Sequence, residues 1–316
     1  MGCLVRSLGA FAVLIVLLVG LRRLTETPVA MAGPGSGERD FVVDGVRWRS
    51  RESPGGPAYE PVVYVHGFLS SSATWKRVLS RASAGRTAIA VDLPGSGYSD
   101  RPWPYDFTVY GQAQHLLRYL EARGIAHAVL VGNSLGGAVC EVAAAARPEQ
   151  ISGLVLVDAA SPETDIPLGF RLLRTPVAGE IQMELLVRPV MEFTLRHRLY
   201  ARAERVTAET VDDWWRPIAV KGTRRAGLEA VRTNTRAASG VLANIRVPTA
   251  VVWGKEDSLL PASEGRRLAG RIGGAVYLEI PGAGHLPQEE MPEEFGRAVS
   301  GFLRTLPNGG ASGARF

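Results

Sequence analysis

The sequence predicts an α/β fold, with a mostly parallel central sheet and helices on both of its faces. Two observations support this prediction. Short runs of β-branched and small apolar residues alternate along the chain with longer stretches at helical spacing. The short runs are apolar throughout, which is typical of parallel strands that are covered on both faces. At 316 residues, the chain is long enough for one such domain with an insertion.

The first 24 residues contain an apolar run, residues 8–21, that lies between Arg6 and the pair Arg22-Arg23. We expect residues 1–24 to be a membrane anchor or signal segment, and the protein to be membrane-associated through it. The run is shorter than the roughly 20 residues of a comfortable spanning helix, so both interpretations stay open. An uncleaved anchor is favoured, because arginines separate the run from the small residues at 30–32. The side of the membrane stays open.

Residues 25–39 are rich in glycine and proline and are expected to form a flexible linker before a domain at 40–305. The domain begins with two short strands around the Asp44-Gly45 turn. Further strands are expected at 61–65, 87–91, 128–131, 151–157, 249–253 and 276–280. Helices are expected from near 73, between Thr108 and Gly124, and at 135–146, 262–271 and 292–303. Residues 161–245 have helical spacing and predict a helical cap insertion, and residues 306–316 predict a loose tail.

The strand at 128–131 and the helix at 135–146 meet at Ser134, within Gly132-Asn133-Ser134-Leu135-Gly136-Gly137. A serine at such a corner needs a strained backbone and almost no side-chain volume on either side, which explains the flanking glycines. The first N–H groups of the helix then point at whatever the serine attacks. We therefore predict that Ser134 is a nucleophile. Because Gly-x-Ser-x-Gly also occurs by chance, the prediction depends on partner residues elsewhere.

Other polar residues follow the predicted strands directly. His66, Asp92 and Asp158 each stand at such a strand end, as Ser134 does. In an open α/β sheet, ligands bind at the carboxyl ends of the strands. The sequence therefore predicts a site along this edge of the sheet.

Four motifs resemble the α/β-hydrolase fold family over residues 40 to 305, and they occur in the family's order. They are His66-Gly67-Phe68, the loop at 92–99, the elbow at 132–136, and Gly254-Lys255-Glu256-Asp257 with Gly282-Ala283-Gly284-His285. The resemblance implies an α/β-hydrolase fold with a helical cap. It places the catalytic base at His285 and implies that His66 braces its loop.

The imidazole of His285 can take the Ser134 proton and return it to the leaving group. Asp257 is expected to accept the other imidazole N–H, with Glu256 and Asp158 as rivals. The backbone N–H groups of Phe68 and Leu135 are predicted to form the oxyanion hole. A serine at the elbow implies acyl transfer, because the dehalogenase and epoxide hydrolase branches use an aspartate there.

We therefore expect a serine hydrolase that cleaves a carboxylic ester. Cap residues Leu168, Phe170, Trp214 and Trp215 are predicted to line an apolar pocket that suits an acyl chain, an aromatic ester or a lipid. The elbow also resembles that of the meta-cleavage carbon–carbon hydrolases, although these usually have tryptophan where Leu286 stands. A cofactor-free haloperoxidase and a non-catalytic ligand receptor are further alternatives.

Composition excludes other classes. The net charge of +5 is not gathered into basic runs with aromatics, so no nucleic-acid partner is expected. The two cysteines, Cys3 and Cys140, lie in unlike settings and predict neither a disulfide nor a zinc site. We expect a small-molecule substrate and neither metal nor organic cofactor. The oligomeric state stays open.

Overall fold

The computed structural model of the protein describes residues 31, 33–56, 58–161, 168–233 and 240–307. In these residues, eight strands form one sheet in the order β1-β2-β4-β3-β5-β6-β7-β8. The strands are β1 (Glu38–Val43), β2 (Val46–Ser53), β3 (Val62–Val65), β4 (Ala88–Val91), β5 (Ala128–Asn133), β6 (Ile151–Val157), β7 (Thr249–Gly254) and β8 (Val276–Ile280). Strand β2 pairs antiparallel with β1 and β4, and every other pair is parallel. The predicted fold class, a mostly parallel sheet with helices, is confirmed.

The helices lie between and beyond these strands. Those of the sheet layers are α2 (Val109–Ala122), α3 (Leu135–Ala146), α9 (Ala262–Ala269), α10 (Pro287–Glu290) and α11 (Pro292–Leu303), with the 3₁₀ turns η1 (Ser72–Trp75) and η4 (Leu242–Asn244). Between β6 and η4 lie α4 (Leu168–Leu173), α5 (Ala178–Leu185), α6 (Arg188–Thr194), η2 (Leu195–Leu199), η3 (Ala203–Arg205), α7 (Ala208–Ala219) and α8 (Thr223–Thr233). The helix expected near residue 73 is only the short turn η1.

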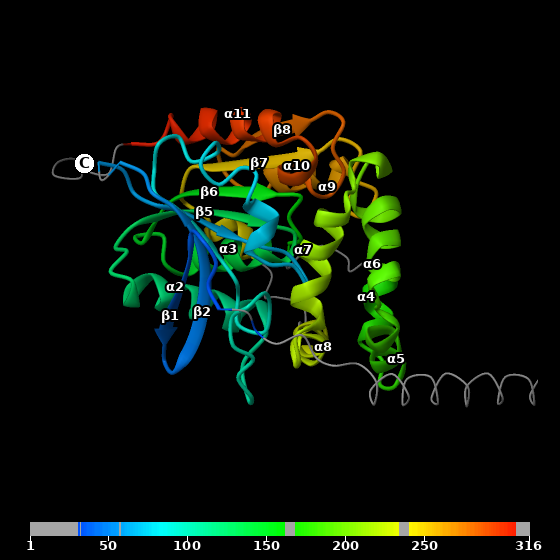
Figure 1. Ribbon diagram of the computed structural model, residues 1–316. Coiled ribbons are helices and arrows are strands. Elements are labelled where there is room, and N and C mark those ends of the chain that lie inside the picture. Colours follow the sequence, from blue (N-terminus) through cyan, green and yellow to red (C-terminus); the bar gives the residue numbers. More distant parts are fainter. Residues whose placement is uncertain (1–30, 32, 57, 162–167, 234–239, 308–316) are drawn as a thin grey trace, which may run out of the picture.

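Both faces of the sheet are buried (Figure 1), with α11 on one side and α2 and α3 on the other. Alternate residues of β5 explain this. Val129 and Val131 pack into the cluster that contains Phe295 of α11, whereas Leu130 packs into the cluster that contains Leu116 of α2. Because successive side chains of a strand point to opposite faces, an apolar run is needed to fill both clusters.

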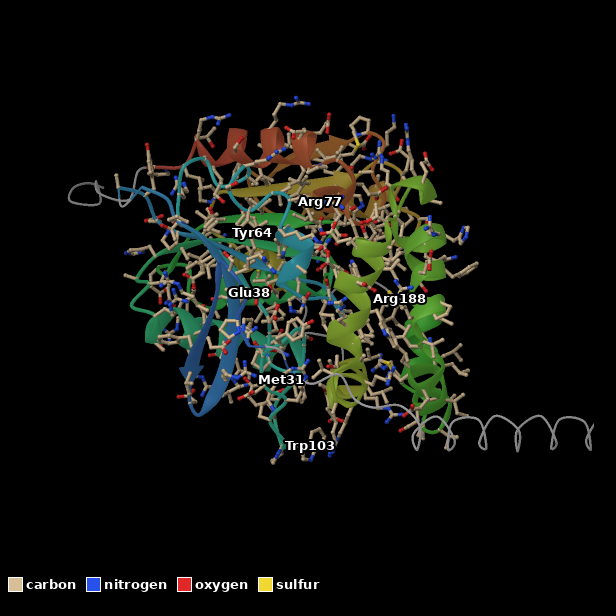
Figure 2. All side chains as sticks on the ribbon, viewed as in Figure 1. Met31, Glu38, Tyr64, Arg77, Trp103 and Arg188 are labelled. Carbon is tan, nitrogen blue, oxygen red and sulfur yellow. The ribbon has the colours of Figure 1, made fainter. Side chains whose placement is uncertain are left out.

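The helices α4–α8 lie at one end of the sheet (Figure 1), where α7 contacts η1, and they have their own apolar cluster. The loop after β4 contacts them. The Arg101 guanidinium donates to Thr223 Oγ1, at the start of α8, with a distance of 2.9 Å from Nη2. The guanidinium carbon of Arg225 lies 3.5 Å from the ring centroid of Trp103, which Figure 2 shows at the tip of this loop. A cation–π contact therefore adds to the hydrogen bond.

The first strand begins two residues before the expected start of the domain at Asp40. Glu38 and Asp40 face arginines of β2, and Arg49 Nη1 lies 3.2 Å from Glu38 Oε2. Cross-strand ion pairs extend the hairpin into residues whose composition predicts a linker.

One prediction from the N-terminal segment is wrong. The apolar run at 8–21 lies outside the described residues, as does the tail at 308–316. Of the helices in the described part, none is long and apolar enough to cross a membrane, and α2, the longest, has 14 residues. A spanning helix needs roughly 20 apolar residues. This finding contradicts the predicted membrane localisation. It also gives no support to the membrane as a partner.

Candidate active site

Ser134 stands at a strained corner between β5 and α3. Its backbone has φ 52° and ψ −121°, a region that residues with a side chain rarely occupy. A Cβ on Gly132 would lie 2.4 Å from the carbonyl oxygen of Gly136, and one on Gly136 would lie 2.4 Å from that of Val65. The strand and the helix therefore approach so closely that only glycine fits at both positions.

His285 and Asp257 meet on the adjoining loops. Asp257 follows β7, His285 follows β8, and His285 Nδ1 lies 2.7 Å from Asp257 Oδ2. The Asp257 side chain is fully buried, and its Oδ1 accepts from the backbone N–H of Leu259 at 2.8 Å and of Leu260 at 3.0 Å. These bonds hold a carboxylate against the imidazole and leave Nε2 as the nitrogen that can exchange a proton.

The histidine loop is anchored next to the serine. Asn133, the residue before Ser134, donates from Nδ2 to the carbonyl of His285 at 3.3 Å and to that of Val157 at 3.1 Å. Among the described contacts there is no hydrogen bond between the Ser134 hydroxyl and the imidazole. In ligand-free sites such bonds are often long and tighten only with substrate bound.

Two backbone amides beside Ser134 can receive an oxyanion. The Leu135 N–H opens helix α3, and Phe68 follows Gly67, where a Cβ would lie 3.1 Å from Ser134 Cβ. Within the described part of the chain, neither N–H donates a hydrogen bond. Free donors of this kind, one of them at the start of a helix, favour a developing negative charge.

His66 braces the loop that carries Phe68. Its Nδ1 lies 2.8 Å from the Gly67 carbonyl, to which it donates, and its Nε2 accepts from the Leu93 N–H at 3.1 Å. Burial lowers the pKa of His66, so the ring stays neutral with the proton on Nδ1. Both nitrogens are thereby used in holding backbone.

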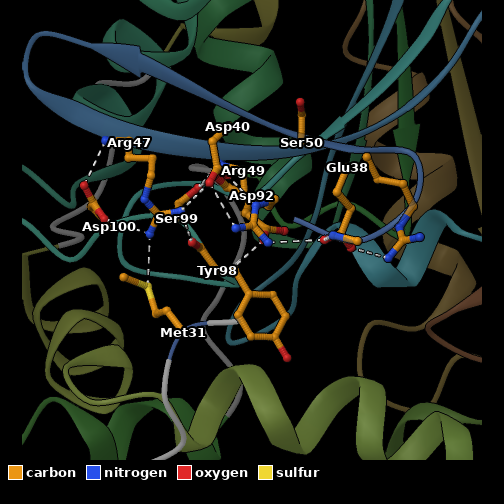
Figure 3. A network of polar contacts seen from close by, with 12 residues as sticks. Met31, Glu38, Asp40, Arg47, Arg49, Ser50, Asp92, Tyr98, Ser99 and Asp100 are labelled. Carbon is orange, nitrogen blue, oxygen red and sulfur yellow. Dashed lines mark hydrogen bonds and ion pairs between the residues drawn. The ribbon is translucent and has the colours of Figure 1, made fainter. Parts of the chain in front are cut away.

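A polar network continues from this loop to the edge of the sheet (Figure 3). Asp92 Oδ1 accepts from the Ser72 N–H at 2.6 Å and its Oδ2 accepts from the Tyr98 N–H at 2.7 Å. The hydroxyl of Ser99 donates to the Asp92 carbonyl and accepts from the Arg49 N–H. The network thus ties the segment after Phe68 to strand β2.

The four predicted cap residues lie in different places. Phe170 contacts Phe68, with ring centroids 5.3 Å apart, and Trp215 lies under the Arg224 guanidinium, 5.5 Å from its ring centroid. Trp214 is buried and donates from Nε1 to Glu289 Oε1 at 3.1 Å. Leu168 begins α4, and its side chain lies outside the described part. Of the four, Phe170 is therefore the one seen beside a proposed oxyanion donor.

Two acids that the sequence analysis missed lie directly after the histidine loop. Glu289 is buried and also accepts from Tyr200 Oη at 2.6 Å, so it joins the helices α4–α8 to the sheet domain. Glu290 accepts from the N–H of Gly284 at 2.6 Å and of Ala201 at 2.7 Å. From the sequence alone, two adjacent acids in the first turn of a helix suggest a solvent-exposed pair.

We expect Glu290 to make stability depend on pH. Burial raises the pKa of its carboxyl to about 7 from an ordinary value of 4.5. The folded state therefore holds this proton more tightly than the unfolded state. The stabilisation is fully present below the unfolded pKa and is lost as the pH rises through about 7.

The measurement is urea unfolding of the wild type and of Glu290→Gln, which cannot titrate, at about pH 5 and about pH 8. The free energy of unfolding of the wild type should fall relative to the variant as the pH rises. A difference that stays constant, or changes with the opposite sign, would contradict the assignment.

Asp158 and Asp257 lie at neighbouring strand ends, with His285 beside them. One ligand atom of each of the three lies within 4.8 Å of the others, and all three side chains are buried. These are donor types that bind metals, but Asp257 and His285 already bond each other through Oδ2 and Nδ1. The geometry suits a proton relay better than an ion.

Comparisons with known proteins agree with this architecture. The family model of the α/β hydrolase fold matches residues 60–292. The chain therefore belongs to the α/β hydrolase fold family, as its motifs predict.

Individual relatives extend over most of the chain. The hydrolase YugF of Bacillus subtilis is 28% identical over 279 residues, covering 84% of this chain and 97% of its own. The 2-hydroxy-6-oxononadienedioate/2-hydroxy-6-oxononatrienedioate hydrolase of Burkholderia vietnamiensis is 28% identical, covering 89% and 100%. The crystal structure of Cfl2 from Burkholderia cenocepacia matches with a TM-score of 0.75 at 26% identity, covering 84% and 95%. The protein is thus similar to hydrolases along nearly their full length.

Proposed function

We propose that this protein is a serine hydrolase that cleaves a carboxylic ester through an acyl-enzyme. The observation that carries the proposal is the 2.7 Å contact between His285 and Asp257, anchored through Asn133 beside an elbow serine. A base that a carboxylate orients, next to a serine and two free amides, is the set of groups that acyl transfer requires.

In the first half of the reaction, Ser134 Oγ attacks the ester carbonyl carbon while its proton passes to His285 Nε2. Asp257 stabilises the imidazolium, and the amides of Phe68 and Leu135 stabilise the oxyanion, each by typically about 3 kcal/mol. The bond to the alkoxy group then breaks, and the alcohol leaves with the proton from His285. In the second half, a water molecule gives a proton to His285 and attacks the acyl-enzyme, which releases the carboxylic acid and restores Ser134.

We propose an apolar acyl or aromatic ester, lipid-like esters included, as the substrate. The Phe68 ring lies next to the proposed oxyanion donor and packs edge-on against Phe170 of α4. An acyl chain that enters beside this pair replaces water with aromatic surface, which favours apolar groups. Leu168, Trp214 and Trp215 remain proposed lining residues of the cap at 161–245, with Trp214 held toward Glu289.

The relative from Burkholderia vietnamiensis, whose printed name is that of a dienedioate and trienedioate hydrolase, favours carbon–carbon bond hydrolysis as the second candidate. The elbow at residues 132–137 also resembles that of the meta-cleavage carbon–carbon hydrolases. Leu286 argues against it, because it stands where that branch usually has tryptophan and is buried in the apolar cluster of α4–α8. The two candidates need the same serine, so only substrates distinguish them.

The test is hydrolysis of p-nitrophenyl esters graded from acetate to palmitate, alongside a vinylogous meta-cleavage 1,5-diketone and labelling by a fluorophosphonate probe. We expect labelling at Ser134 and ester turnover that rises with acyl length before it falls. Turnover of the diketone alone would establish the second candidate. A folded protein that takes up no probe and cleaves no ester would contradict the proposed function.

A further inference from the structure

Asp158 is a buried carboxyl for which the proposed mechanism has no role. It follows β6 directly, is fully buried, and has a positive φ of 40°. Its N–H donates to the carbonyl of Val252 at 3.0 Å, and its Oδ1 accepts from the Gly254 N–H at 2.9 Å. Because β6 and β7 are neighbours, these bonds hold the carboxyl against the loop that carries Asp257.

The two carboxyls are unequally supported. Asp257 receives three donors, from His285 Nδ1 and the N–H groups of Leu259 and Leu260. Asp158 receives the one from Gly254, and no donor reaches its buried Oδ2 from any described residue. A bare carboxylate oxygen in that position would be costly, whereas a protonated one becomes a donor.

Two adjacent buried carboxyls cannot both be ionised without partners, so they share one proton. Asp257, with three donors, keeps the charge. Burial raises the pKa of Asp158 well above its usual range, and the negative charge of the neighbouring Asp257 raises it further. Among the described residues, His285, Glu290 and Tyr277 also lie near Asp158. None of them is a fixed cation that would ionise it.

We propose that Asp158 is a positioning residue that carries a proton on Oδ2 and donates it as a hydrogen bond to the Asp257 carboxylate. This proposal rests on the proposed function, because it concerns the triad that carries it. The hydrogen bond gives the Asp257 carboxylate a further donor besides His285, Leu259 and Leu260, and so helps to fix its position. It also draws charge away from the Asp257–His285 contact, so His285 holds its proton less tightly and returns it to the leaving group.

Two variants separate this role from a merely structural one. The asparagine of Asp158→Asn has nearly the same volume and keeps an acceptor for Gly254 and a donor for Asp257. The larger, apolar leucine of Asp158→Leu keeps neither bond. The measurement is kcat/KM for p-nitrophenyl acetate against pH, whose acidic limb reports the free enzyme's base. The apparent pKa of this limb should stay within about 0.3 unit of the wild-type value in Asp158→Asn and rise by roughly 0.5–1 unit in Asp158→Leu.

A second readout does not need turnover. The infrared difference spectrum of the wild type minus Asp158→Asn at about pH 8 should contain a carboxylic-acid C=O band, because the proton stays on Asp158 above the usual carboxyl range. If the protein cleaves no ester, this band still tests the proton, so failure of the proposed function is seen separately.

Three results would overturn the proposal. One is an apparent pKa of the acidic limb that falls by about one unit in Asp158→Asn, since such a fall means that the substitution removed a negative charge. The others are a spectrum without the acid band and a folded Asp158→Leu protein with an unmoved limb. If Asp158→Leu does not fold, the Asn variant and the spectrum decide.

Discussion

Replacing Ser134 by alanine is expected to lower kcat/KM for ester hydrolysis by about 10⁴-fold or more and to abolish fluorophosphonate labelling. The change removes the nucleophile but leaves the amides of Phe68 and Leu135 in place, so a small rate above that of water should survive. The fold should be retained, since alanine is smaller than serine and the Ser134 side chain has no hydrogen-bond partner among the described residues. Steady-state kinetics and intact-mass labelling measure the two effects.

The matched control is Ser300→Ala on α11. That hydroxyl donates to the Arg297 carbonyl at 3.4 Å, away from the strand ends, so kcat/KM should not change. A Ser134→Ala protein with wild-type melting temperature and a rate within tenfold of wild type would remove Ser134 from the mechanism. The proposed function would then fail with it.

Features that depend on residues close together in the chain, such as strand limits, helix caps and the elbow, could be predicted from the sequence. The apolar runs at 151–157 and 276–280 coincide with β6 and β8, because turn residues bound each run on both sides. Thr108 caps α2, as its hydroxyl accepts the Gly111 N–H at 2.9 Å. The elbow at Ser134 is equally local, since its glycines and its strained backbone lie within five residues.

Contacts between distant segments could not be predicted in this way. Trp214 reads as an apolar cap residue, yet its indole N–H bonds Glu289, 75 positions later, and joins the cap region to the sheet domain. Asp158 and Asp257 were rivals for one role, because the sequence shows that both end strands but gives no strand order. The pairing of β6 with β7 places them side by side and makes a shared proton the better interpretation.

The site therefore depends on how closely the elbow packs against the neighbouring strand. Gly136 lies where α3 crosses the end of β3, and its Cβ position is 2.4 Å from the Val65 carbonyl oxygen and 2.5 Å from that of His66. These are backbone atoms, so no side-chain rotation can relieve the contact. Moving them displaces Phe68, whose amide belongs to the proposed oxyanion hole.

We expect Gly136→Ala to lower the free energy of unfolding by about 3 kcal/mol or more, a large part of the 5–15 kcal/mol that stabilises an ordinary domain. The folded fraction of the Gly136→Ala protein should also lose ester turnover, because the added Cβ forces helix α3 and the Phe68 loop apart. Urea or thermal unfolding measures the first effect and kcat per labelled serine the second.

Gly301 of α11 provides the control. It lies near the end of a helix, and apart from the backbone of its own helix no described atom lies within 4 Å of the Cβ that alanine would add. Gly301→Ala should therefore stabilise the protein by up to about 1 kcal/mol, because alanine is the better helix former. If Gly136→Ala were as stable as Gly301→Ala and equally active, the elbow would not be the tight crossing on which the alignment of Ser134 with its oxyanion donors depends.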